Sequence, residues 1–482
     1  MSPDELAQRF ERRKDFDLVD VALVALPMYL LTLECVCSVH REFPPIALFL
    51  LRAVRAGLTD EKEIAAFLGL DPSVTRVVTR QMLDGGYIVK GGDEETISLS
   101  AQGEKIIEQE KEFVPQEEVH IVIFDGLIRK PVWLSGEQLL RPAEIDRSNT
   151  IEIRPYPGAL PEIEDLNLAD VTEVLRKQHG GAKEFGRDFL ALSRVARRSR
   201  VFRSGVGLAY RARRGPDTQF AFVIDGVPNA KLEQVFAEKG GPRKMGFIKA
   251  LSQVGVDQRL KRHLGEQVVA LLPDSAQLSA KRQALAGARL GLDIAAKRAE
   301  SEPSEEFRGK LAEARQRFEE YDRALRMFPA RPLAVYEVGM LLDDALRTAS
   351  DRVLIAVGEF WKNRPGRDTV SKLEKALKKG VRIHLFELTK EKQGGDRNQP
   401  PASNDLDKLG RRYPNLKMLQ TKRRGFFFLI KDRQFAAIGN RPFLGPATRA
   451  RMFHEFAGYL LQSRELVDAY SARLQEGVDS DG

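Results

Sequence analysis

The sequence predicts a multidomain α+β protein, and three observations lead to this prediction. The length of 482 residues corresponds to about three domains at roughly 150 residues each. With 43% hydrophobic and 30% charged residues, the chain can form buried cores. The spacing of hydrophobic residues also changes along the chain. It is helical in residues 44–112, strand-like in 113–270, and alternates between helix and strand from 331 to 482.

The first 43 residues are expected to form an N-terminal strand or arm. Residues 32–39 alternate, with Leu33, Cys35 and Cys37 on one side. A proline and a glutamate interrupt the apolar run from 21 to 39, which argues against a membrane span. Two cysteines cannot form a disulfide framework, and the six histidines lack metal-ligand spacing, so we expect a cytoplasmic protein without metal or cofactor.

Residues 44–112 are expected to contain three helices, a short hairpin and a fourth helix. The helices are predicted over 45–55, 60–68 and 73–83, with Thr59 capping the second and Asp71 the third. The third helix is expected to bury Val74, Val77, Val78 and Met82.

This order of elements resembles the bacterial winged-helix family, and residues 63–88 and 97–103 carry the resemblance. In that family the third helix enters the DNA major groove and the wing contacts the backbone. The resemblance therefore implies DNA contacts from Ser73, Thr75, Arg76, Thr79 and Arg80, with Lys90 on the wing. Protein binding is the alternative, because Asp93, Glu94 and Glu95 would make the wing tip acidic.

Residues 113–270 are expected to form a β-rich α+β middle domain that contains a basic helix. Two strands flank a turn at 215–217, and a helix is predicted over 170–178. Residues 187–214 hold nine arginines and one acid, so local ion-pair partners are few. We predict a helix over 184–204 that presents a phosphate-binding stripe, with a solvated surface as the alternative. Its candidate residues are Arg194, Arg197, Arg198, Arg200 and Arg203.

A helical hairpin is predicted for residues 271–330, with a break at Pro303. Residues 331–482 then alternate between helix and strand, which is typical of a largely parallel sheet. Four segments in this region, at 351–358, 376–385, 425–440 and 453–458, resemble the phospholipase D superfamily.

That resemblance implies a degenerate domain without catalytic residues. Catalysis in the family needs a His-x-Lys-x4-Asp motif, whose histidine attacks phosphorus. With Asp432 aligned to the aspartate, Gly425 occupies the histidine position and Phe427 the lysine position. Asp432 and Glu455 match the family, whereas Asn440 and Pro442 depart from it. His384, or a pair of His454 and Glu455, remains a weak catalytic alternative.

The C-terminal domain is nevertheless expected to bind nucleic acid, because residues 361–424 hold eighteen basic and seven acidic residues. Its candidate residues are Arg411, Arg412, Lys417, Lys422, Arg423 and Arg424.

Together these features predict a non-enzymatic accessory subunit that binds nucleic acid, most simply DNA. The resemblances imply the setting of such proteins: bacterial DNA repair, restriction or anti-phage defence, with a separate ATPase, helicase or nuclease, and a homodimer through the phospholipase D-like domain. A protein-assembly scaffold is the alternative, and an active phosphodiesterase is a distant third.

Overall fold

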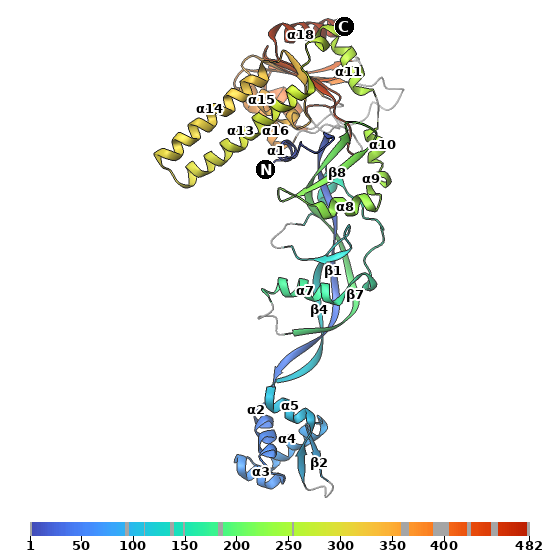
Figure 1. The fold of residues 1–482 in the computed structure, drawn as a ribbon, viewed down its shortest axis with the longest axis vertical. Coiled ribbons are helices and arrows are strands. Elements are labelled where there is room, and N and C mark those ends of the chain that lie inside the picture. The colour runs from blue at the N-terminus through green and yellow to red at the C-terminus, as the bar shows by residue number, and fades with distance from the viewer. Residues whose placement is uncertain are drawn as a thin grey trace. The chain divides into compact units, whose positions relative to one another are not determined.

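Figure 1 shows the chain in a computed structural model that forms two compact units. Unit 1 comprises residues 1–26, 140–156 and 203–482, and unit 2 comprises 27–139 and 157–202. The five-domain division expected from the sequence stays a prediction. The structure describes residues 2–91, 96–109, 111–134, 139–147, 150–181, 187–252, 255–357, 366–388, 404–421, 426–444 and 452–479.

Unit 2 is built on the strand predicted near the N-terminus. Strand β1 (Phe16–Glu42) pairs antiparallel with β4 (Lys111–Asp125), which in turn pairs with β5 (Lys130–Val132). The alternation predicted at 32–39 is confirmed, because Leu33, Cys35 and Cys37 are buried beneath α7 (Leu168–Gln178). Among the described residues, no helix is both long and apolar enough to cross a membrane.

The second part of unit 2 contains the predicted helices and hairpin in the predicted order. One detail differs: Asp60, not Thr59, caps the second helix, because its carboxylate accepts hydrogen bonds from the Lys62 and Glu63 amides. The elements are α2 (Pro45–Arg55), α3 (Glu61–Leu68), α4 (Pro72–Asp84), β2 (Ile88–Lys90), β3 (Ile97–Leu99) and α5 (Ala101–Gln109).

The predicted basic helix over 184–204 is wrong, because these residues belong to the long strand β7 (Arg187–Ala212). The buried residues Phe189, Val195 and Val201 are separated by even numbers of positions, as on one face of a strand. The predicted hairpin is confirmed, since β7 pairs with β8 (Thr218–Ile224) from Val206↔Val223 to Arg211↔Thr218.

The other short elements of this part of the chain are α1 (Pro3–Arg9), α6 (Pro142–Arg147), β6 (Ile151–Glu152), β9 (Val227–Pro228), α8 (Ala230–Glu238), α9 (Gly241–Lys244), α10 (Phe247–Leu251), α11 (Val256–Leu264) and α12 (Glu266–Ala270) in unit 1, and the 3-10 helix Ile163–Asp165 in unit 2.

The predicted helical hairpin is confirmed as α13 (Ser275–Ser301) and α14 (Glu305–Arg326), which pack against each other (Figure 1). Both helices begin after a residue type that commonly caps helices, Asp274 before α13 and Ser304 before α14.

The C-terminal sheet has the order β10-β16-β15-β14-β11-β12-β13. Only β11, β12 and β13 are mutually parallel, so the expectation of a largely parallel sheet is wrong for the other half. There β14 and β15 form a hairpin through a short turn at 432–434, which suits antiparallel pairing, whereas the antiparallel partners β11 and β14, and β10 and β16, come from distant parts of the sequence. Core clusters lie on both faces, one including Leu346 and Leu373 from α15 and α16, the other Leu260 and Val467 from α11 and α18.

The elements of this part are β10 (Ala330–Pro332), α15 (Glu337–Thr348), β11 (Arg352–Val357), α16 (Arg367–Lys378), β12 (Arg382–Leu388), α17 (Asn404–Arg412), β13 (Leu416–Thr421), β14 (Phe427–Lys431), β15 (Phe435–Gly439), β16 (Gly458–Leu461) and α18 (Arg464–Asp479).

Candidate nucleic-acid interface and the positions aligned with the phospholipase D motif

The exposed face of α4 differs from the face that the sequence predicts. Thr75 and Thr79 are buried, with 0% and 4% of their surface exposed, whereas Val74 and Val77 are exposed at 41% and 58%. The N-cap Asp71 and Pro72 fix where the helix starts, and packing against α2 and α3 then turns the threonines inward. Thr75 and Thr79 are therefore not candidate DNA contacts.

The remaining predicted residues of α4 form one stripe. Ser73, Arg76 and Arg80 are all exposed and follow the i, i+3, i+7 spacing of a single helix face. The Ser73 hydroxyl donates to the Asp71 carboxylate at 2.6 Å and so belongs to the helix cap. Neither arginine makes an ion pair with another described residue, and Lys90 on β2 is likewise exposed. These cations are available to a polyanion.

Most of the arginines of β7 have acidic partners, contrary to the prediction. Arg194 binds Glu34 on β1 through two hydrogen bonds of 2.6 and 2.7 Å. Arg198 pairs with Glu162, and Arg203 with Asp225. These acids come from other segments, so a count within residues 187–214 cannot find them.

The helix-based grouping of the β7 arginines is also wrong. Successive side chains of a strand point to opposite faces, so Arg197 does not share a face with Arg194 and Arg198. The Arg200 guanidinium lies 5.0 Å from the centre of the Phe202 ring. Arg197 is exposed and makes no ion pair within the described part of the chain.

Asp432 has a structural role at the position where the resembled family carries an aspartate. It occupies the β14–β15 turn with a φ of 48°. Its carboxylate accepts hydrogen bonds from the backbone amides of Ser350, Asp351 and Arg352 at 2.8–3.0 Å. Burial would raise the pKa of Asp432, but these hydrogen bonds outweigh it and lower the pKa below its ordinary value. Asp432 thereby fastens the turn to the start of β11.

The structure also places some of the other positions that align with the phospholipase D motif. Phe427, at the lysine position, begins β14 and is half-buried. Gly425, at the histidine position, lies outside the described residues, as do Lys422, Arg423 and Arg424. The Asn440 side chain donates to the Glu455 carbonyl at 2.7 Å and accepts from the Ala457 amide at 3.1 Å.

His454 and Glu455 are bound to separate partners. The Glu455 carboxylate makes an ion pair with Arg211 at 2.6 Å, and its pKa is raised mainly by burial. The His454 amide donates to the buried carboxylate of Asp20 at 2.7 Å. Burial, followed by the charge of Arg441, lowers the pKa of the His454 ring. These contacts join residues that are far apart in sequence.

His384 lies on β12, opposite Lys417 of β13. Burial lowers the pKa of His384, and the charges of Lys417, Arg382 and Arg352 lower it further. These effects favour the neutral form of the imidazole.

Two predicted cations of the C-terminal domain remain open to solvent. Arg411 in the last turn of α17 and Lys417 on the edge strand β13 are exposed and make no ion pair with another described residue. Arg412 instead binds Glu374 at 3.1 Å and stacks on the Tyr413 ring.

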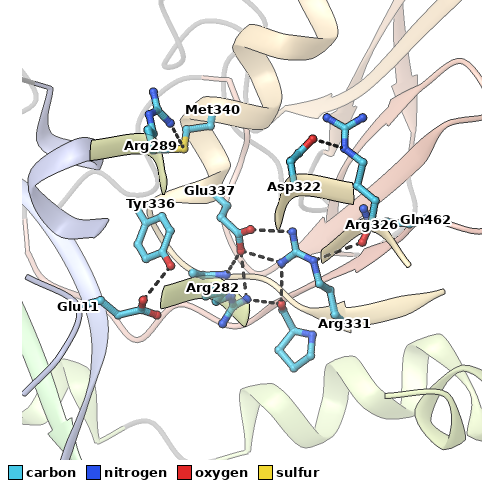
Figure 2. A network of polar contacts seen from close by, with 12 residues as sticks. Glu11, Arg282, Arg289, Asp322, Arg326, Arg331, Tyr336, Glu337, Met340 and Gln462 are labelled. Carbon is cyan, nitrogen blue, oxygen red and sulfur yellow. Dashed lines mark hydrogen bonds and ion pairs between the residues drawn. The ribbon is translucent and has the colours of Figure 1, made fainter. Parts of the chain in front are cut away.

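A polar network that sequence reasoning missed joins α13 to α15. Figure 2 shows the guanidinium groups of Arg331 and Arg282 converging on the Glu337 carboxylate, with Tyr336 donating to Glu11 nearby. Arg282, Arg331, Tyr336 and Glu337 border a cavity of about 1050 Å³ within unit 1. Burial would raise the pKa of Glu337, but the two arginines outweigh it and hold the pKa at about 2. No short motif marks this network, because Arg282 and Glu337 lie 55 residues apart.

Comparisons with known proteins place phospholipase D family members among the structural neighbours. No protein-family profile and no curated protein matches the chain. The phospholipase D family member Nuc from Salmonella typhimurium shares 17% identity over 29% of this chain and 84% of its own, with a TM-score of 0.22. NucT from Helicobacter pylori shares 15% sequence identity over 31% of this chain and 94% of its own length, with a TM-score of 0.23.

A third neighbour is TrmBL2, described as an archaeal chromatin protein with a novel mode of DNA binding. It shares 14% identity over 37% of this chain and 64% of its own, with a TM-score of 0.23. TM-scores this low establish no common activity, so any function has to be argued from the residues of this chain.

Proposed function

We propose that this protein is a non-catalytic, DNA-binding accessory subunit. The observation that carries the proposal is the stripe of Ser73, Arg76 and Arg80 on α4, within a winged-helix order of elements. A helix of this kind enters the major groove, where an arginine can donate two hydrogen bonds to guanine. The exposed Val77 within the same stripe suits contact with a thymine methyl group.

The absence of catalysis in this proposal rests on the former phospholipase D positions. Glycine in place of histidine provides no nucleophile, and phenylalanine in place of lysine provides no cation for the phosphoryl oxygens. The two acids that match the family, Asp432 and Glu455, are engaged with backbone amides and with Arg211. An accessory role follows, in which a separate partner performs any chemistry on DNA.

The C-terminal domain contributes charge to this proposal but no recognition element. Arg411 and Lys417 are exposed cations without ion-pair partners in the described part of the chain. Such cations act on phosphates at any sequence and make binding dependent on salt.

The test compares the full-length protein with an Arg76→Ala/Arg80→Ala double variant. Fluorescence anisotropy against labelled duplex DNA over a salt series measures the affinity. Two bidentate arginine contacts at about 1–3 kcal/mol each predict at least a tenfold loss. Arg55→Ala, at an exposed arginine of α2, is the matched control and should leave the affinity within about twofold.

The same samples, incubated with and without Mg²⁺, should show no cleavage of DNA. An equal effect of the double variant and Arg55→Ala would remove α4 as the DNA contact. Cleavage by the wild-type protein would overturn the non-catalytic assignment.

A protein-assembly scaffold is the second candidate, and a specific observation favours it. Phe49 on α2 and Phe67 on α3 are 53% and 69% exposed, which is unusual for aromatic residues on a small helical domain. A scaffold of this type predicts that Phe67→Ser reduces recovery of co-purifying proteins. Binding of those proteins should persist at high salt, and the DNA affinity should stay unchanged.

A further inference from the structure

Four side chains suited to a metal ion lie on one face of the β1–β4 pair in unit 2. Cys35 and Cys37 follow one another on β1, and Glu118 and His120 on β4, each pair separated by one residue. The register places Cys35 opposite Glu118 and Leu33 opposite His120. All four therefore belong to the face that packs against α7.

Three of these residues already bring their donor atoms together. The Cys37 sulfur, a Glu118 carboxylate oxygen and a His120 ring nitrogen all lie within 4.8 Å of one another. The His120 Nε2 atom is 3.0 Å from the Glu118 carboxylate. Bond lengths of about 2.0–2.3 Å in a tetrahedral zinc site set donor atoms about 3.3–3.8 Å apart. Small rotations of the side chains would close the remaining gap.

The cluster lies in a largely buried environment. Both cysteines are fully buried, and the side chains of Glu118 and His120 are only 13% and 9% exposed. The Phe189 ring packs edge-on against the His120 ring, with the ring centres 5.2 Å apart. The ring of His179, the C-cap residue of α7, has its centre 6.4 Å from that of the His120 ring. A position with this little water favours direct coordination over a hydrated ion.

We propose that Cys35, Cys37, Glu118 and His120 form a zinc site that joins β1 to β4. Thiolate and imidazole donors select zinc over magnesium or calcium, and a set of two sulfurs, one nitrogen and one oxygen suits tetrahedral coordination. Cys35 supplies the fourth ligand because it lies directly opposite Glu118 and between the other donors on the same face. On binding, both thiols release their protons to solvent. The His120 ring gives up the proton on Nε2 and stays neutral with a proton on Nδ1, so that the hydrogen bond between His120 and Glu118 is replaced by two metal bonds.

The cysteine content makes a cobalt spectrum specific for this site. Cys35 and Cys37 are the only cysteines among the 482 residues, so a thiolate-to-cobalt charge-transfer band can arise nowhere else in the chain. Full-length protein without a histidine tag, kept reduced with a phosphine, is freed of metal and titrated with Co²⁺. We expect the near-ultraviolet band to saturate at one equivalent and to disappear when Zn²⁺ is added. Absence of the band in the wild-type protein overturns the proposal, whatever the behaviour of any variant.

Matched variants then test the ligand set. Competition with a chromophoric chelator measures the Zn²⁺ affinity, which should fall at least tenfold in Cys37→Ser, Cys35→Ser and His120→Ala. Glu118→Gln should weaken binding, whereas Glu117→Gln, at the exposed neighbour on the opposite face of β4, should not. The circular dichroism of each metal-free variant is recorded first. Zn²⁺ should raise the melting temperature of the wild-type protein and not that of Cys37→Ser. Wild-type affinity in both Cys37→Ser and His120→Ala would overturn the assignment.

Discussion

Replacing Glu337 by glutamine should destabilise unit 1 substantially. The Glu337 carboxylate accepts two hydrogen bonds from Arg331 at 2.9 and 2.7 Å, one from Arg282 at 3.1 Å and one from the Ala334 amide at 2.7 Å. Glutamine has only one acceptor oxygen and turns an N–H group toward the guanidinium groups. Arg331 is 4% exposed, so its charge would stay buried without compensation. Losing one partner of such a pair costs about 3–5 kcal/mol.

The dependence of the free energy of unfolding on pH gives a second value for the stabilisation by the Glu337 carboxylate. The pKa of Glu337 falls from an ordinary 4.5 to about 2, which corresponds to about 3 kcal/mol at 1.36 kcal/mol per pKa unit. Because the pKa is depressed in the folded state, this stabilisation is fully present above pH 4.5 and is lost as the pH falls towards 2. Linkage predicts that about 2 kcal/mol of it is gone at pH 3. Glu337→Gln lacks this titration, so the difference between the two proteins should narrow over that interval.

Urea unfolding followed by circular dichroism at pH 7, 5, 4 and 3 measures the difference. Glu306→Gln is the control, because Glu306 pairs with Lys310 on the exposed surface of α14, where solvent screens an ion pair and leaves it little effect on stability. A Glu337→Gln variant that loses no more stability than Glu306→Gln at pH 7 would refute the role given to the buried carboxylate. The same loss of stability at pH 7 and pH 3 would refute the depressed pKa of Glu337.

Three further substitutions test other parts of the structure by the same unfolding assay. Asp432→Asn should cost about 2 kcal/mol, because asparagine has only one acceptor oxygen for the three backbone amides and its remaining hydrogen bonds carry no charge, while it still tolerates the positive φ. Thr79→Val should instead stabilise unit 2 by about 1 kcal/mol, since the buried Thr79 hydroxyl has no hydrogen-bond partner among the described residues. Gly103→Ala should destabilise it by about 1–3 kcal/mol, because a Cβ there would lie 2.2 Å from the Tyr87 carbonyl oxygen. Destabilisation by Thr79→Val, or wild-type stability of either other variant, would contradict the corresponding contact.

The local elements were largely predictable from the sequence. Helix α2 has the predicted bounds, the N-cap at Asp71 is confirmed, and the hairpin helices α13 and α14 break where Pro303 predicts. Capping residues, prolines and the spacing of apolar residues act over a few positions, so they can be recognised in the sequence itself. The main error lies in residues 184–204. There the spacing of the arginines indicated a helix, whereas the spacing of the buried residues is that of a strand.

The candidate sites depended more strongly on the fold. The missing histidine and lysine at 425 and 427 are facts of the sequence, and no arrangement of the chain changes them. The partners of Arg194 and Arg198, and the inward turn of Thr75 and Thr79, were set by packing against distant segments.

What the sequence by itself determined, then, is the chemistry that each position can supply and the local structure around it. Only the tertiary structure decided which of those groups meet. Cys37 and His120 are 83 positions apart, and each lies in a short alternating run that reads as an ordinary strand. The antiparallel register of β1 and β4 brings them to one buried face. Strand pairing of this kind is fixed by the burial of a whole face and by distant turns, so no local window of the sequence contains it.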